Sequence, residues 1–75
     1  MLLPNKLFSY QESILSKLPV ILKKLSTRPY GVKELYIASK TELSGISEYI
    51  EVLDCLYALG KIELDRDQEV LKYVV

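Results

Sequence analysis

Three acidic side chains, Glu48, Glu51 and Asp54, recur at helical spacing in the second half of this 75-residue chain. Carboxylates can act as general acid and base, or bind a metal ion, when a cleft holds them close together. Nothing in the surrounding sequence indicates such a cleft, and the three residues line one side of a predicted helix. We therefore interpret them as a solvated or partner-facing acidic stripe.

The other residue types offer little for catalysis or metal binding. The chain has no histidine, which is the usual general base at neutral pH and the commonest metal ligand. Its one cysteine, Cys55, cannot form an intramolecular disulfide or a structural zinc site, and no cationic neighbour activates the thiol. The glycines Gly31, Gly45 and Gly60 stand at element boundaries and form no phosphate-binding loop. We predict that the protein is not an enzyme and uses no cofactor or metal.

The first predicted helix starts near Ser9, because Ser9 and Glu12 have the spacing of a capping box. Apolar residues then recur every three or four positions as far as Leu25. Pro19 interrupts this pattern, since it lacks a backbone donor and its ring clashes with the preceding turn. We expect a kink, or two short helices that meet near Leu18.

Turn signals and periodicity place the remaining elements. They are a turn at 26–31, a second helix at 32–40, a third helix at about 46–59, and a hairpin of strands 61–65 and 70–75 around a turn at 66–69. Ser44 is the expected N-cap of the third helix, and Gly60 suits its C-terminal end. In the strand 61–65, Ile62 and Leu64 are expected to point inward.

The third helix is apolar around roughly half of its circumference. Its apolar residues are Ile46, Tyr49, Ile50, Val52, Leu53, Leu56, Tyr57 and Leu59. Such an arc is wider than a small three-helix core requires, so we expect this helix to be buried on two sides. Tyrosine is favoured at protein interfaces, and the chain has six. Protein binding is the function that this helix favours.

The composition predicts one domain, residues 1–75, with 49% hydrophobic residues. The expected fold class is α+β, mainly α: a winged helix-turn-helix-like domain of three helices plus a C-terminal β-hairpin, with residues 1–3 as a candidate edge strand. A single cysteine and an N-terminus unlike a signal peptide predict a cytoplasmic location. No apolar run approaches the roughly 20 residues of a membrane span.

Charge is divided along the chain. Residues 1–40 carry seven Lys or Arg against two acids, a net of +5, whereas residues 41–75 carry three against eight, a net of −5. A helix that reads DNA normally brings Lys or Arg to the phosphates and bases, but the third helix has neither. Candidate nucleic-acid contacts are therefore limited to the basic residues of the first helix and its end: Lys17, Lys23, Lys24 and Arg28.

Candidate partner-binding residues lie on the third helix and at the C-terminus. They are Glu48, Tyr49, Glu51, Val52, Asp54, Leu59 and Tyr73. The carboxylates would pair with basic residues of a partner, and the apolar residues would bury against it. Strand addition to the free edge of 70–75 is a second predicted mode of contact.

Three stretches, MLLPNK at the start, VKEL at the second helix and above all LDCLYALGKIEL, resemble the small middle-component proteins of bacterial ABC-three-component systems. The resemblance covers nearly the whole chain. It implies a winged-helix-like adaptor without a catalytic motif, encoded beside an ABC-type ATPase related to the SMC and RecN group and beside a variable effector, often a nuclease. It also implies a role in defence against phage or plasmids. The residues that match the family pattern are expected at core or junction positions: Leu53, Leu56, Tyr57, Leu59, Gly60 and Ile62.

The preferred hypothesis is a non-enzymatic adaptor that docks on an SMC/RecN-like ABC ATPase and on an effector protein. Such a protein would meet DNA only indirectly, through the complex, and would not contact a membrane; self-association is left open. The alternative is a small winged-helix DNA-binding regulator that uses the basic first helix and Lys61. A weaker third hypothesis is a protein inhibitor of the toxin–antitoxin type, which would use the same interface as the adaptor.

Overall fold

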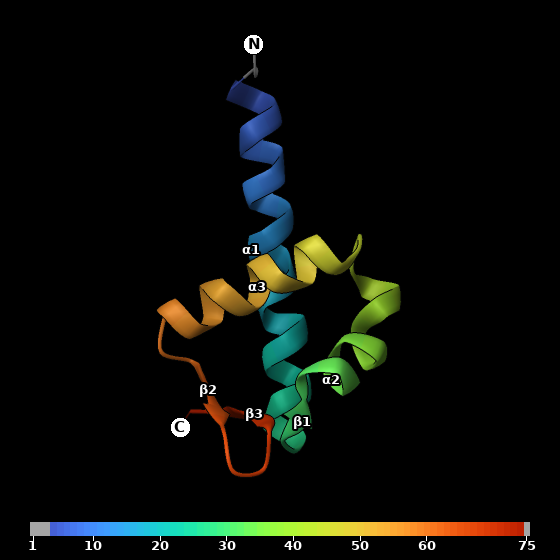
Figure 1. Ribbon diagram of the computed structural model, residues 1–75. Coiled ribbons are helices and arrows are strands. Elements are labelled where there is room, and N and C mark those ends of the chain that lie inside the picture. Colours follow the sequence, from blue (N-terminus) through green and yellow to red (C-terminus); the bar gives the residue numbers. More distant parts are fainter. Residues whose placement is uncertain (1–3, 75) are drawn as a thin grey trace.

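The computed structural model describes the backbone of residues 4–74 and the side chains of residues 11–74. Its elements are α1 (Pro4–Thr27), β1 (Tyr30–Gly31), α2 (Val32–Ser39), the 3-10 turn η1 (Lys40–Glu42), α3 (Ile46–Ala58), β2 (Ile62–Asp65) and β3 (Val70–Tyr73). Helix α1 forms the long axis, α3 packs across it, and α2 and the sheet lie toward its C-terminal end (Figure 1). The predicted fold class is confirmed: the protein is α+β, mainly α, in an arrangement compatible with a winged-helix-like fold.

The first helix differs from its prediction at its start, and it is one helix, not two that meet near Leu18. It begins at Pro4, so Ser9 lies inside the helix and is not its N-cap. It also continues without a break through Pro19. Pro19 is exposed and removes the hydrogen bond to the carbonyl of Leu15, whose side chain is exposed as well. Water can reach that side of the helix and hydrate the carbonyl, so the proline does not end the helix.

The sheet has the strand order β1-β3-β2, and both pairings are antiparallel. The predicted hairpin is confirmed, with β2 and β3 joined by a turn at 66–69. The prediction of a simple turn at 26–31 is wrong for its last two residues, because Tyr30 and Gly31 pair with Leu71 and Val70. Strand β3 is therefore central, and β1 occupies its expected free edge at Val70 and Leu71. The candidate edge strand at residues 1–3 lies outside the described residues.

Local interactions close the hairpin turn. The Oδ1 atom of Asp65 accepts hydrogen bonds from the amides of Asp67 and Gln68, at 3.0 and 3.1 Å. The Oδ2 atom of Asp65 lies 2.7 Å from Nζ of Lys72, across the two strands. Because this one side chain satisfies turn amides and pairs with the opposite strand, the turn holds the register of the hairpin.

The core lies where α1, α2 and α3 meet the sheet. Its buried apolar residues are Ile14, Ile21, Leu25, Leu35, Tyr49, Val52, Leu56, Ile62 and Leu71. Among the residues expected at core or junction positions, Leu56 and Ile62 are buried, whereas Tyr57 and Leu59 are exposed. Helix α3 starts at Ile46 as predicted, but its N-cap is Gly45 and not Ser44.

Candidate protein-docking surface

Helix α3 carries two apolar rows on neighbouring sides. The inner row, Tyr49, Val52 and Leu56, is at most 2% exposed and packs in the core. The outer row consists of Ile46, Ile50, Leu53 and Tyr57, of which Ile46, Ile50 and Tyr57 are 52%, 51% and 65% exposed. The expected excess of apolar surface on this helix is confirmed. We call the four residues of the outer row the outer face of α3.

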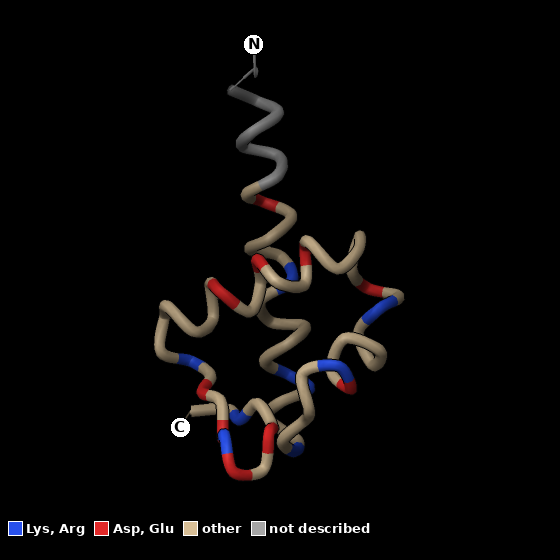
Figure 2. Tube along the Cα trace, viewed as in Figure 1, with Lys and Arg blue, Asp and Glu red and all other residues tan. Residues whose placement is uncertain are grey.

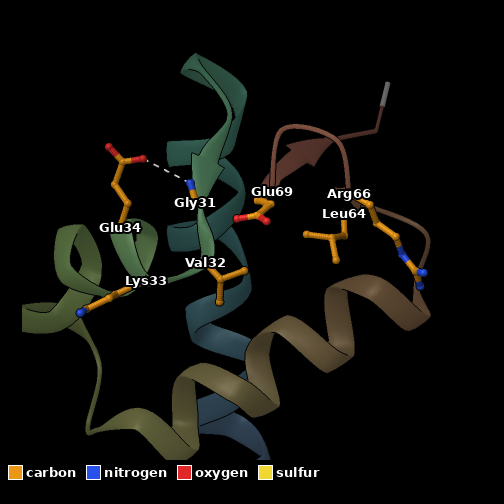
Figure 3. Close-up of a pocket in the computed structure, with 7 residues that line it drawn as sticks. All are labelled: Gly31, Val32, Lys33, Glu34, Leu64, Arg66 and Glu69. Carbon is orange, nitrogen blue, oxygen red and sulfur yellow. Dashed lines mark hydrogen bonds between the residues drawn. The ribbon is translucent and has the colours of Figure 1, made fainter.

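A groove runs beside the C-terminal half of the outer face. It is lined by Leu53 and Tyr57 of α3 together with Val32 at the start of α2 and Leu64 of β2. A second hollow adjoins it, sharing Val32, Leu64 and Arg66. Figure 3 shows these three side chains near α3, between the start of α2 and the hairpin.

Leu64 points inward as predicted, but its side chain is not buried. Its neighbour on the same face of β2, Ile62, is buried, but Leu64 is 45% exposed. Successive residues of one parity share a face of the sheet, so both side chains point toward α3. Leu64 lies farther along the hairpin, where it lines the groove. The groove is thus a continuation of the core that the described residues 11–74 leave uncovered.

The structure divides the predicted partner-binding residues into two groups. Glu51, Asp54, Leu59 and Tyr73 are exposed. Contrary to their predicted exposure, Glu48, Tyr49 and Val52 are buried within the chain, so in this structure they present no surface to a partner. The reason is the rotation of α3: its contact with α1 and the sheet is centred between Val52 and Tyr49, which brings Glu48 to the edge of the core.

Glu48 makes the main polar contact between α1 and the start of α3. It is 7% exposed, and its carboxylate accepts hydrogen bonds from the Ser13 hydroxyl at 2.9 Å and from the Ser44 amide at 3.0 Å. Burial raises the pKa of Glu48, but these two hydrogen bonds and the charge of Lys17 together outweigh it and lower the pKa. Glu48 is therefore a charged structural residue, and each of its two carboxylate oxygens already accepts a hydrogen bond.

Tyr49 has a comparable role at the other side of the core. Its hydroxyl donates a hydrogen bond to the carbonyl of Val32, and its ring lies 5.0 Å from the ring of Tyr36, centroid to centroid. Burial raises the pKa of Tyr49 to about 12. The residue thus fixes α3 against the start of α2.

Glu51 and Asp54 form the acidic edge of the outer face. Figure 2 shows acidic and no basic positions along α3. Within residues 11–74 neither carboxylate has an ion-pair partner or a side-chain hydrogen bond. Asp54 also lines the groove, beside Leu53 and opposite the hairpin residue Arg66. The apolar surface is therefore bordered by negative charge on α3 and by positive charge on the hairpin.

The candidate nucleic-acid contacts do not form one patch. Lys17 and Lys24 are two turns apart on the same side of α1, and both are partly buried. Lys23 points about 100° away from Lys24. Arg28 forms a salt bridge of 3.0 Å with Glu34, and its guanidinium lies 3.8 Å from the centroid of the Tyr30 ring. Lys23 is exposed, and with Lys24 it lines a hollow that also contains the acidic residue Glu42.

The sequence alone did not distinguish the outer row of α3 from the core row. Both rows fall within one continuous apolar arc, and the sequence does not say which part of that arc meets α1. The alternating four-and-three spacing of residues 46, 50, 53 and 57 is only a weak signal, because the core residues 49, 52 and 56 follow the same spacing. Leu64 and Val32 gave no such signal, since their exposure depends on how far the hairpin and α2 stand apart.

The described residues 11–74 contain no group of side chains with the composition and proximity of a metal site. Among the described helices, none has the length and apolar character that a bilayer crossing requires.

One comparison with known proteins gives a match. The model of the family described as "ABC-three component (ABC-3C) system Middle Component 7" matches residues 3–71. No curated protein and no solved structure matches the chain.

Proposed function

The chain belongs to the Middle Component 7 family of ABC-three component systems, and from that premise we propose that it is a non-enzymatic adaptor. It joins the ABC-type ATPase of the system, of the SMC/RecN-like type, to the effector protein of the same system. The complex acts in defence against phage or plasmids. A protein that is the middle part of a three-component system needs surfaces for its neighbours, and the outer face of α3 has the properties of one.

The exposed apolar face of α3 is the observation that carries this proposal. Two isoleucines and a tyrosine stand more than half exposed in one row, beside the row of the same helix that is buried in the core. Contiguous exposed apolar surface of this kind marks interaction sites in soluble domains. Tyr57 adds a large ring with a polar tip, a residue type enriched at interfaces. Glu51 and Asp54 border this face and are free to pair with basic residues of a partner.

An adaptor also needs a second contact. Leu59 and Tyr73, at the ends of α3 and β3, are exposed apolar residues outside the outer face. Leu59 follows Tyr57 by two positions, so it projects from a different side of the α3 axis. The first turns of α1 extend beyond the rest of the molecule (Figure 1). These features supply room for a second component while the outer face is occupied.

Co-purification of the three components tests the proposal. The ATPase, the effector and this chain are co-expressed, with an affinity tag on the ATPase, and the effector recovered with the ATPase is measured with and without the chain. We expect the effector to be recovered only when the chain is present, because the chain forms the link between them. Equal recovery of the effector in its absence would refute the adaptor function.

DNA binding through α1 is the competing function, and titration of the isolated chain with duplex DNA at two salt concentrations separates the two. Binding through phosphates weakens steeply as salt rises. An adaptor of the proposed kind shows no such binding. Salt-sensitive binding that is lost in a Lys23→Glu/Lys24→Glu variant would favour a DNA-binding regulator.

A further inference from the structure

The outer face of α3 has the residue spacing of a two-helix seam. Ile46, Ile50, Leu53 and Tyr57 are separated by four, three and four positions, as are the a and d residues of a coiled coil. Their row runs roughly 16 Å along α3, which is about three helical turns. From this geometry we propose that the outer face binds an amphipathic α-helix of a protein partner, and that this helix carries Lys or Arg on the side that faces Asp54. The inference rests on the proposed adaptor function and adds the kind of segment that is bound.

A helix fits this surface better than an extended strand does. In a seam of this spacing, the side chains of the facing helix insert between those of the first at every turn. The groove lined by Leu53, Tyr57, Val32 and Leu64 continues the row toward the hairpin and gives the bound helix a second apolar wall. A strand would instead place alternate residues on opposite sides and would bury only every second one.

Charge on the two borders of the surface selects the partner. On one side the row adjoins the core residues Tyr49 and Leu56, so that side offers no charge. On the other side stand Asp54 and Glu51, which have no ion-pair partner within residues 11–74. Arg66 lines the hairpin wall of the groove. The bound helix therefore has basic residues toward α3 and acidic or neutral residues toward Arg66, which also fixes its orientation.

The same charges disfavour a second copy of this chain as the occupant. Two copies that paired through their outer faces would bring four carboxylates, from Glu51 and Asp54 of each, to the borders of one interface. Helix α3 has no Lys or Arg to compensate them. Among the residues described, Arg66 is the one basic residue that lines the groove, so each copy would bring two carboxylates against one guanidinium. A different protein with a basic flank removes this repulsion.

Two matched isoleucine variants test the seam. Ile50→Asp places a charge in the middle of the row, whereas Ile37→Asp makes the same change at an exposed position of α2, 63% exposed against 51% for Ile50. The probes are synthetic peptides from the ATPase and the effector with apolar residues at seam spacing and Lys or Arg on one flank. We expect Ile50→Asp to weaken binding of such a peptide at least tenfold, since desolvating a carboxylate in the seam costs more than about 1.4 kcal/mol. Ile37→Asp should leave the affinity unchanged.

A charge exchange tests the partner's basic flank. Asp54→Lys should weaken binding of the basic peptide severalfold, and a peptide with Glu in place of the facing Lys should restore it. The far-UV circular dichroism of the mixture should show a gain of helix on binding. Binding that survives Ile50→Asp, or an extended bound peptide, would overturn the proposal. So would a chain that dimerises in sedimentation experiments and becomes monomeric in Ile50→Asp.

The two proposals fail in different ways. If the three components assemble and Ile50→Asp assembles equally well, the seam is wrong and the adaptor function stands. If the wild-type chain recovers neither component, the adaptor function itself is wrong. The melting temperature of each variant is measured alongside, and both exposed substitutions should leave it nearly unchanged.

Discussion

Replacement of Glu48 tests whether this residue stabilises the contact between α1 and α3, as the structure indicates, and does not bind a partner. We expect Glu48→Ala to lower the free energy of unfolding by about 2 kcal/mol. The change removes two hydrogen bonds to a buried carboxylate, each worth roughly 1.5–3 kcal/mol when the partner group stays dry. The Ser44 amide belongs to an exposed residue and regains water, which reduces its share. For a domain of this length, a loss of about 2 kcal/mol lowers the melting temperature by roughly 8–16 °C.

Urea unfolding followed by circular dichroism measures this loss, and Glu51→Ala is the matched control. Glu51 lies one turn away on α3 and is exposed, so its replacement should change the stability by less than about 0.5 kcal/mol. A double-mutant cycle with Ser13→Ala isolates the 2.9 Å contact between α1 and α3. Equal effects of Glu48→Ala and Glu51→Ala would contradict the reasoning. Loss of partner binding by a fully stable Glu48→Ala protein would contradict it too.

The same carboxylate predicts a pH dependence. The folded state lowers the pKa of Glu48 below its ordinary value of 4.5, so folding favours the charged form. This contribution is fully present above about pH 4.5 and is lost as the pH falls through the folded-state pKa. The stability difference between the wild type and Glu48→Gln should therefore shrink between pH 7 and pH 3. Glu34 and Asp65, whose pKa values are also lowered, are present in both proteins and cancel in the comparison.

Two further predictions concern the inner row of α3. Tyr49→Phe should lower the free energy of unfolding by about 1 kcal/mol, because it removes the hydrogen bond to Val32 inside the core. In an alkaline absorbance titration of the wild type, one tyrosine should ionise only near pH 12. That ionisation should be missing from the titration of the variant. Leu56→Ala should cost about 2–5 kcal/mol, whereas Tyr57→Ala at the next position should cost less than about 1 kcal/mol, as measured by urea unfolding. Similar losses for Leu56→Ala and Tyr57→Ala would mean that the two rows of α3 are not distinct.

Much of the fold follows from local sequence signals. The bounds of α3 and the hairpin were predicted closely, since periodic apolar residues, Gly60 and the polar turn at 66–69 act over short distances. The errors arose where a distant contact decides the structure. Strand β1 exists because Tyr30 and Gly31 meet β3, some forty residues later in the chain. The continuity of α1 at Pro19 depends on which side of the helix faces water, and Pro19 happens to lie on that side.

The candidate site was predicted in kind but not residue by residue. The width of the apolar arc correctly indicated more apolar surface on α3 than the core uses. The rotation of α3 about its axis was not predictable from the arc, because Val52 and Ile50 are equally good core residues by type. Glu48 shows the same limit: its burial follows from this rotation, and nothing in the sequence identifies Ser13, 35 positions earlier, as its hydrogen-bond partner.

The two rows of α3 link the stability of this chain to the presence of a partner. One side of the helix holds together a small core, which for a domain of this length leaves modest stability. If the proposed partner occupies the outer face on the neighbouring side, the free energy of binding adds to that of folding. A surplus molecule would then lack this contribution, spend more time unfolded, and be removed first by proteases. The steady-state amount of the protein should then follow the amount of its partner, so that the ratio of components is corrected after translation.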